Sequence, residues 1–138
     1  VMHSRGTPAT MRELTHYSDV VTDVRDFLAG RAKELGAAGV PDDRIILDPG
    51  IGFAKTPQQN LELMKRLDEI TALPWPILVG TSRKSFIGAV LDLPEDQRIE
   101  GTLATVVMSV LAGARIVRVH DVEQTVRAVR MTEAIMGA

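Results

Sequence analysis

The sequence predicts an α/β fold in which short parallel strands alternate with helices. Four short apolar runs, at about 1–4, 45–47, 76–80 and 116–120, each precede a longer stretch with helical spacing. Continuous apolar runs are typical of parallel strands that are buried on both faces by crossover helices. Four such units make up either half of an eight-stranded barrel or a small open sheet, and the periodicity is the same for both.

The composition is that of an ordinary soluble domain. The 138 residues include 16 Lys and Arg against 18 Asp and Glu, so the net charge is −2. A nucleic-acid or membrane-surface partner would need a basic patch, so neither is expected. No apolar run approaches the ~18 residues that a membrane-spanning helix needs. The chain has no cysteine, which fits a reducing cytoplasm. We expect one cytoplasmic domain over residues 1–138.

The first unit begins with the run 1–4 and turns at Gly6-Thr7-Pro8. An amphipathic helix is predicted to follow, because its apolar residues advance by 3 or 4 positions until Gly36 ends it. No polar turn precedes residue 1, so we expect the chain to be part of a longer protein. The apolar face of this helix consists of Val21, Val24, Leu28, Ala32 and Leu35.

The second unit is the run 45–47, which ends at Asp48-Pro49-Gly50. Thr56 is predicted to cap the next helix, with Pro57 at its first position and Gln59 completing a capping box. Pro74 is predicted to stop this helix. Its apolar stripe is Leu63, Leu67 and Ile70.

The third unit is the run 76–80, followed by a short helix at 86–91, a polar loop at 94–98 and a helix from about 102 to 112. This last helix is apolar on more than one face, whereas packing on one side of a sheet needs only one stripe. The surplus face is predicted to be covered by a second copy of the chain. The residues expected there are Val106, Val107 and Val110 or their neighbours.

The fourth unit is the run 116–120, and Asp121 is predicted to cap the helix after it. One face of that helix is formed by Val122, Val126, Val129 and Met136.

Polar residues collect at the carboxyl ends of all four runs, where parallel α/β folds bind ligands. The carboxylate of Asp48 suits a planar neutral ligand with adjacent N–H donors, or else it caps its own Pro-Gly turn. Arg118 and His120 lie two residues apart on one strand face. They suit a phosphate or diphosphate, unless Arg118 forms an internal ion pair with Asp48 or Asp121.

Taken together, the segments at these four strand ends resemble the C-terminal half of proteins of the dihydropteroate synthase family. The matching segments are Met2–Pro8, Asp48–Phe53, Gly80–Ser85 and Arg118–Val122, and the resemblance covers the whole chain. It implies a TIM barrel of which residues 1–138 are the last four βα units, strands five to eight. It also implies a transferase of folate biosynthesis. Such enzymes condense hydroxymethyl-dihydropterin diphosphate with p-aminobenzoate to dihydropteroate and pyrophosphate, and sulfonamides compete for the aminobenzoate position.

The resemblance further implies a role for each candidate site residue. Asp48 and Lys84 would hold the pterin, in a slot that also includes Met2, Leu78 and Gly80. The aminobenzoate would lie against Phe53, Arg83 and Ser85. Arg118 and His120 would bind the diphosphate and stabilise it as it leaves, and these two with Lys84 would be the catalytic residues.

The family also uses Mg²⁺ and forms homodimers through its last helices. The resemblance places the Asn that helps hold Mg²⁺ on the family's first strand, outside this chain, so no metal ligand is expected here. The isolated chain is expected to be inactive because half of the site would be missing. Two alternatives are a non-catalytic half-barrel that self-associates and a methyltetrahydrofolate-binding methyltransferase domain. The latter shares the barrel, but it releases no pyrophosphate.

Overall fold

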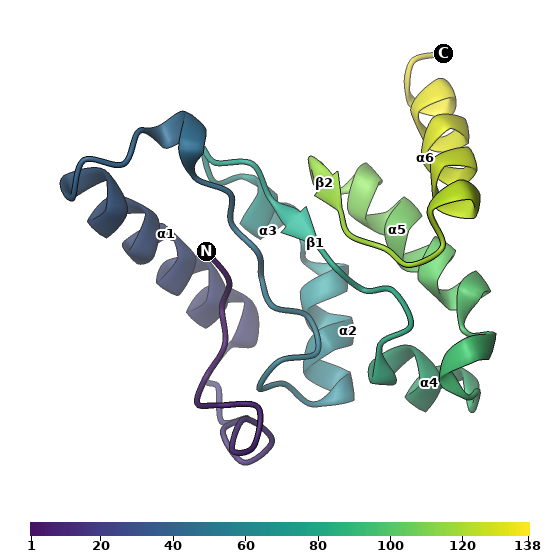
Figure 1. The fold of residues 1–138 in the computed structure, drawn as a ribbon, viewed down its shortest axis with the longest axis horizontal. Coiled ribbons are helices and arrows are strands. Elements are labelled where there is room, and N and C mark those ends of the chain that lie inside the picture. Colours follow the sequence, from purple (N-terminus) through teal and green to yellow (C-terminus); the bar gives the residue numbers. More distant parts are fainter.

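The computed structural model describes residues 1–138 and confirms the predicted alternation of parallel extended segments with helices (Figure 1). Strand β1, Leu78–Val79, pairs in parallel with β2, Ile116–Val117. Two isolated parallel bridges continue this order toward the N-terminus, so four segments lie side by side in the order of the chain. These bridges join Met2 to Asp48 and Leu47 to Ile77.

Six α-helices and two short 3₁₀ turns connect and cover these segments. None of the helices combines the length and the apolar character needed to cross a bilayer. The helices are α1 Val20–Ala37, α2 Pro57–Lys65, α3 Asp68–Thr71, α4 Ser85–Leu91, α5 Ile99–Leu111 and α6 Val122–Met136, and the 3₁₀ turns are Asp42–Arg44 and Glu95–Gln97.

The capping box predicted at the start of α2 is present. The Thr56 hydroxyl accepts from the Gln59 backbone N–H, and the Gln59 side chain accepts from the Thr56 N–H at 2.8 Å. The single helix expected as far as Pro74 is wrong, because the chain leaves the helix at Arg66 and resumes it as α3. The Arg66 guanidinium lies 2.7 Å from the Glu69 carboxylate and 2.9 Å from that of Asp19, so it ties α2, α3 and the start of α1 together.

The main core lies between α1, α2, α3, α4 and the extended segments. All five residues that were predicted for the inner face of α1 lie in this core or pack against it, and so do Leu63, Leu67 and Ile70 from α2 and α3. This core positions the loops that follow the second and third extended segments, since both loops leave directly from buried strand residues.

Helices α5 and α6 pack on each other, at the end of the molecule opposite α1 (Figure 1). Helix α5 begins at Ile99, three residues earlier than predicted. Val106 is only 1% exposed and belongs to the interior. The prediction that it contacts a second copy is therefore wrong. The open side of α5 carries Met108 and Leu111 instead, and Val107 and Val110 are half-buried.

The apolar face predicted for α6 forms, but this chain leaves it uncovered. Val122, Val126 and Val129 line a groove of about 560 Å³ that runs between α6 and the end of β2. The buried residues of α6 are instead Thr125 and Thr132.

Candidate functional site

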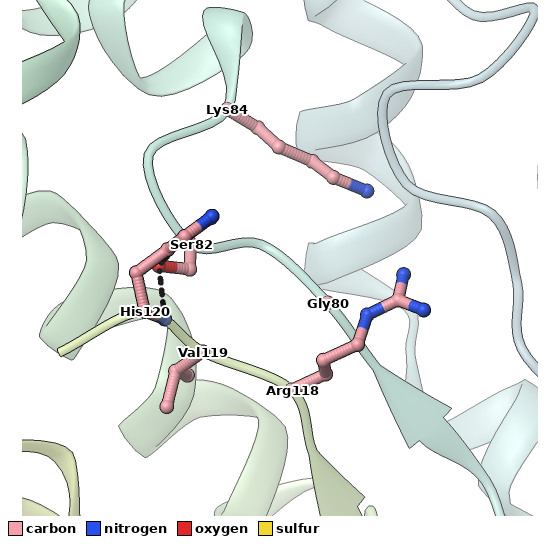
Figure 2. Close-up of a pocket in the computed structure, with 6 residues that line it drawn as sticks. All are labelled: Gly80, Ser82, Lys84, Arg118, Val119 and His120. Carbon is pink, nitrogen blue, oxygen red and sulfur yellow. Dashed lines mark hydrogen bonds between the residues drawn. The ribbon is translucent and has the colours of Figure 1, made fainter. Parts of the chain in front are cut away.

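The carboxyl ends of β1 and β2 meet at a cavity of about 250 Å³ (Figure 2). Its lining includes four of the predicted site residues, together with Ser82 and Val119. Lys84 approaches from the loop before α4, and the Arg118 guanidinium extends from the end of β2 across Gly80 (Figure 2). The predicted residues that line the cavity are Gly80, Lys84, Arg118 and His120.

Asp48 lies beside this cavity at the end of the second extended segment. Its Oδ1 accepts the Gly50 backbone N–H at 2.7 Å, and its Oδ2 lies 3.9 Å from Arg118 Nη2. Both alternatives to ligand binding, the turn cap and the ion pair, are therefore present. An ionised carboxylate has about four acceptor positions, so these contacts leave capacity for a ligand with paired N–H donors.

Lys84 joins the third loop to the second. Its ammonium donates to the carbonyl of Ile51 and lies 4.8 Å from the centroid of the Phe53 ring. Burial lowers the pKa of Lys84 to about 8, and the negative charge of Asp48 opposes this shift in part. An ammonium near a carboxylate and an aromatic ring can donate to the polar edge of a planar ligand, while the aromatic ring offers a face for stacking.

His120 is oriented by Ser82, which lies within the matching segment Gly80–Ser85 but had no predicted role. The Ser82 hydroxyl lies 2.9 Å from His120 Nδ1 and also accepts the His120 backbone N–H at 3.2 Å. This leaves Nε2 of the imidazole available to a ligand. The contact spans 38 residues of sequence, so no local pattern marks Ser82.

Arg83 occupies the left-handed region with φ 58°, and its guanidinium forms two hydrogen bonds to Asp121, at 2.6 and 3.1 Å. These bonds lower the pKa of Asp121. Asp121 occupies the N-cap position of α6 as predicted, but its carboxylate binds Arg83 and makes no cap hydrogen bond. The backbone of Arg83 is held by the Thr102 hydroxyl at 3.0 Å and by Arg98 at 2.8 Å.

The remaining predicted residues lie around this edge without lining the cavity. Met2 pairs with Asp48 on the first extended segment, and Leu78 lies within β1. Phe53 lies on the loop after Asp48, and Ser85 is the exposed first residue of α4. Contacts of Phe53, Arg83 and Ser85 with an aminobenzoate stay predictions.

Comparison with known proteins gives one consistent family. A family model described as pterin binding enzyme matches residues 1–120. The curated dihydropteroate synthase of Synechocystis sp. is 46% identical over 136 residues, which cover 98% of this chain and 47% of that protein. The chain spans about half the length of the curated relatives that it matches.

Solved structures agree with the sequence relatives. Dihydropteroate synthase from Thermus thermophilus in complex with 4-aminobenzoate has a TM-score of 0.94 at 43% identity, over 99% of this chain and 56% of that one. The Yersinia pestis dihydropteroate synthase in a sulfonamide drug complex has a TM-score of 0.94 at 39% identity, over 99% of this chain and 50% of that one.

Proposed function

The chain belongs to the family of pterin-binding enzymes, and we propose that it is the C-terminal half of a dihydropteroate synthase. In this proposal, the four parallel segments are strands five to eight of a TIM barrel. The observation that carries the proposal is the cavity edge, where one carboxylate, Asp48, faces two cations, Lys84 and Arg118, with His120 beside them.

The pterin would lie between Asp48 and Lys84. The carboxylate would accept the paired N–H donors of the amino-pyrimidinone edge, and the ammonium would donate to the pterin carbonyl and ring nitrogen. The aminobenzoate would lie against the Phe53 ring, which is 4.8 Å from the Lys84 ammonium. Relatives solved with 4-aminobenzoate and with a sulfonamide drug support these ligands for the subsite.

The diphosphate would lie against Arg118 and His120. In the reaction, the bond between the pterin methylene carbon and the diphosphate oxygen breaks. The aminobenzoate nitrogen then forms a bond to that carbon and loses a proton. The Arg118 guanidinium would stabilise the charge that develops on the leaving group. The His120 imidazole would add to this, because its hydrogen bond to Ser82 orients it before the reaction begins.

The family resemblance implies Mg²⁺, and we propose that its ligands lie in the half of the enzyme outside this chain. The chain brings together no group of three or more histidine, cysteine or carboxylate side chains. The carboxylate beside the cavity, Asp48, already accepts from Gly50 and faces Arg118. The roles given above do not depend on the ion.

We also propose that the complete enzyme is a homodimer that uses the open sides of α5 and α6. Contiguous exposed apolar surface favours association. Ile135→Lys is expected to give a monomer by analytical ultracentrifugation, whereas Val90→Lys on α4 should leave the dimer intact. The exposed apolar residues of these two helices include Met108, Leu111, Met131 and Ile135.

The groove between α6 and β2 favours a second candidate, a non-catalytic half-barrel that self-associates through this surface. In the first candidate, the other half of the barrel covers the groove. Val126→Lys places a charge in the groove. If the isolated chain is an oligomer that this substitution dissociates, and if it never gains activity with a complementary half, the second candidate holds.

The test joins this chain to the part of the Synechocystis enzyme that the chain does not match. The soluble fusion is expected to form dihydropteroate and release pyrophosphate, and the chain alone is expected to be inactive. Asp48→Ala should abolish pterin binding in calorimetry, whereas Asp43→Ala in the exposed 3₁₀ turn should not. A folded fusion without condensation activity would overturn the proposal, and methyl transfer from methyltetrahydrofolate would replace it with the methyltransferase alternative.

A further inference from the structure

The loop at 50–55, which carries Phe53, has a backbone that needs outside support. Gly50, Gly52 and Ala54 all have positive φ, at 65°, 83° and 51°. A Cβ at position 50 would lie 1.9 Å from the carbonyl oxygen of His3, so the loop presses against the first extended segment. A tight loop of this kind turns its carbonyl groups inward, and each buried carbonyl needs a donor.

Lys55 supplies donors for two of these carbonyl groups. Its ammonium is 2.9 Å from the Gly50 oxygen, 2.9 Å from the Phe53 oxygen and 3.0 Å from His3 Nδ1. These three contacts use all three donors of an ammonium group. The residue is 9% exposed, although lysine is rarely buried without a reason.

Below about pH 7 the charge states of the pair agree with this geometry, because the pKa of Lys55, about 7, then leaves it mostly as an ammonium with three donors. Burial, followed by the charge of Lys55, lowers the pKa of His3 to about 4, so its ring is neutral near pH 7 and Nδ1 can accept. Burial lowers the pKa of Lys55 to about 7, against the opposing charge of Asp48. The other charged groups around the pair are Arg5 and Lys84.

Three further side chains hold the rest of the loop. Tyr17 donates its hydroxyl to the Ala54 carbonyl at 2.9 Å, and Asn60 accepts the Gly52 backbone N–H at 2.7 Å. Lys84 donates to the Ile51 carbonyl. The Phe53 backbone N–H also donates to the Gly50 carbonyl at 3.0 Å. Among the four side chains, only Lys55 contacts both of these residues, which are the two ends of the turn that places the Phe53 ring.

We propose that Lys55 is a positioning residue for the aminobenzoate wall. Its ammonium ties the Gly50 and Phe53 carbonyls to His3 and so fixes the Phe53 ring relative to Lys84, without touching substrate. The link to aminobenzoate rests on the proposed function, whereas the bracing of the loop rests on the contacts alone.

The first test measures backbone amide hydrogen exchange on the 138-residue chain. Lys55→Met keeps the length of the side chain and removes its donors, and Lys65→Met on the exposed side of α2 is the matched control. Exchange at the Phe53 and Gly52 amides is expected to rise at least tenfold in Lys55→Met, with α1 unchanged. Unchanged exchange in a folded Lys55→Met chain would overturn the proposal.

If Lys55→Met does not fold, His3→Leu decides the same point, because it removes one of the three contacts and keeps the other two. Faster exchange confined to residues 50–55 supports the brace, and unchanged exchange there overturns it.

The second test separates positioning from general support in the active fusion. Lys55→Met should raise the KM for aminobenzoate at least tenfold and leave the KM for the pterin diphosphate within about twofold. Equal rises in both values would overturn the positioning role. If the unsubstituted fusion has no activity, the proposed function fails, and the exchange experiment still decides the brace.

Discussion

Asp48→Asn tests the pterin assignment with little change in the size of the side chain. The Asp48 side chain is 13% exposed and makes two contacts, a hydrogen bond from Gly50 at 2.7 Å and an ion pair with Arg118 at 3.9 Å. Asparagine keeps one oxygen for the Gly50 N–H, and the ion pair is long. The substitution is therefore expected to cost less than about 1 kcal/mol of folding free energy.

The substitution should reduce the free energy of pterin binding by much more than the free energy of folding. Hydrogen bonds to a charged group contribute about 1.5–3 kcal/mol each. Two such bonds to the pterin edge are weakened, and the new amide N–H₂ would face a donor on the ligand. A loss of about 2–4 kcal/mol corresponds to weaker pterin binding by about 30-fold to about 1,000-fold.

Isothermal calorimetry of the fusion with hydroxymethyl-dihydropterin measures this loss, and Asp43→Asn is the control. Removing the charge of Asp48 should also lower the pKa of Lys84 further below about 8, because that carboxylate opposes the effect of burial. An NMR titration of the lysine side chain follows this shift. Pterin affinity within threefold of the parent, with an unchanged urea midpoint, would refute the assignment.

Three further predictions concern stability and the anion site. Thr56→Ala removes the capping box of α2 and should lower the free energy of unfolding by about 1 kcal/mol in urea; a loss as large in Thr56→Ser would show that the cap is not the cause. His3 has a folded pKa of about 4 against 6.5 unfolded, so the unfolded chain binds more protons and stability should fall from pH 6.5 to pH 4. Urea midpoints across this range should change less in His3→Gln, and an identical acid limb would contradict the link. Arg118→Gln in the fusion should weaken inhibition by pyrophosphate far more than binding of aminobenzoate, and equal losses would indicate a structural role.

A helix cap can be predicted from the sequence when all of its residues are close neighbours in the chain. Thr56, Pro57 and Gln59 lie within four positions, and their capping box is present as predicted. Asp121 has an equally good local pattern for a cap, yet its carboxylate binds Arg83, which is 38 residues away. A propensity argument compares only near neighbours, so it misses a stronger partner that the fold supplies.

The candidate site likewise contains residues that the sequence predicts and residues whose contacts depend on the fold. Strand-end position predicted that the polar residues after the four runs meet at one edge, since parallel strands end at one edge. The family resemblance singled out Lys84, Arg118 and His120 among them, and these three line one cavity. Ser82 and Lys55 act through contacts with distant residues, His120 and His3. A serine and a lysine are ordinary residues in a polar loop, so these two contacts can be seen only in the folded chain.

The support of the loop at 50–55 limits how its length can vary. Five of its backbone groups form hydrogen bonds with side chains: two with Lys55 and one each with Tyr17, Asn60 and Lys84. An inserted or deleted residue would move these groups out of step with their partners and leave several unpaired. The exposed turn at 94–97 has no such constraint and should accept insertions. Diversity at position 53, the proposed aminobenzoate wall, is therefore expected as exchange of the side chain, in a loop whose number of residues stays constant.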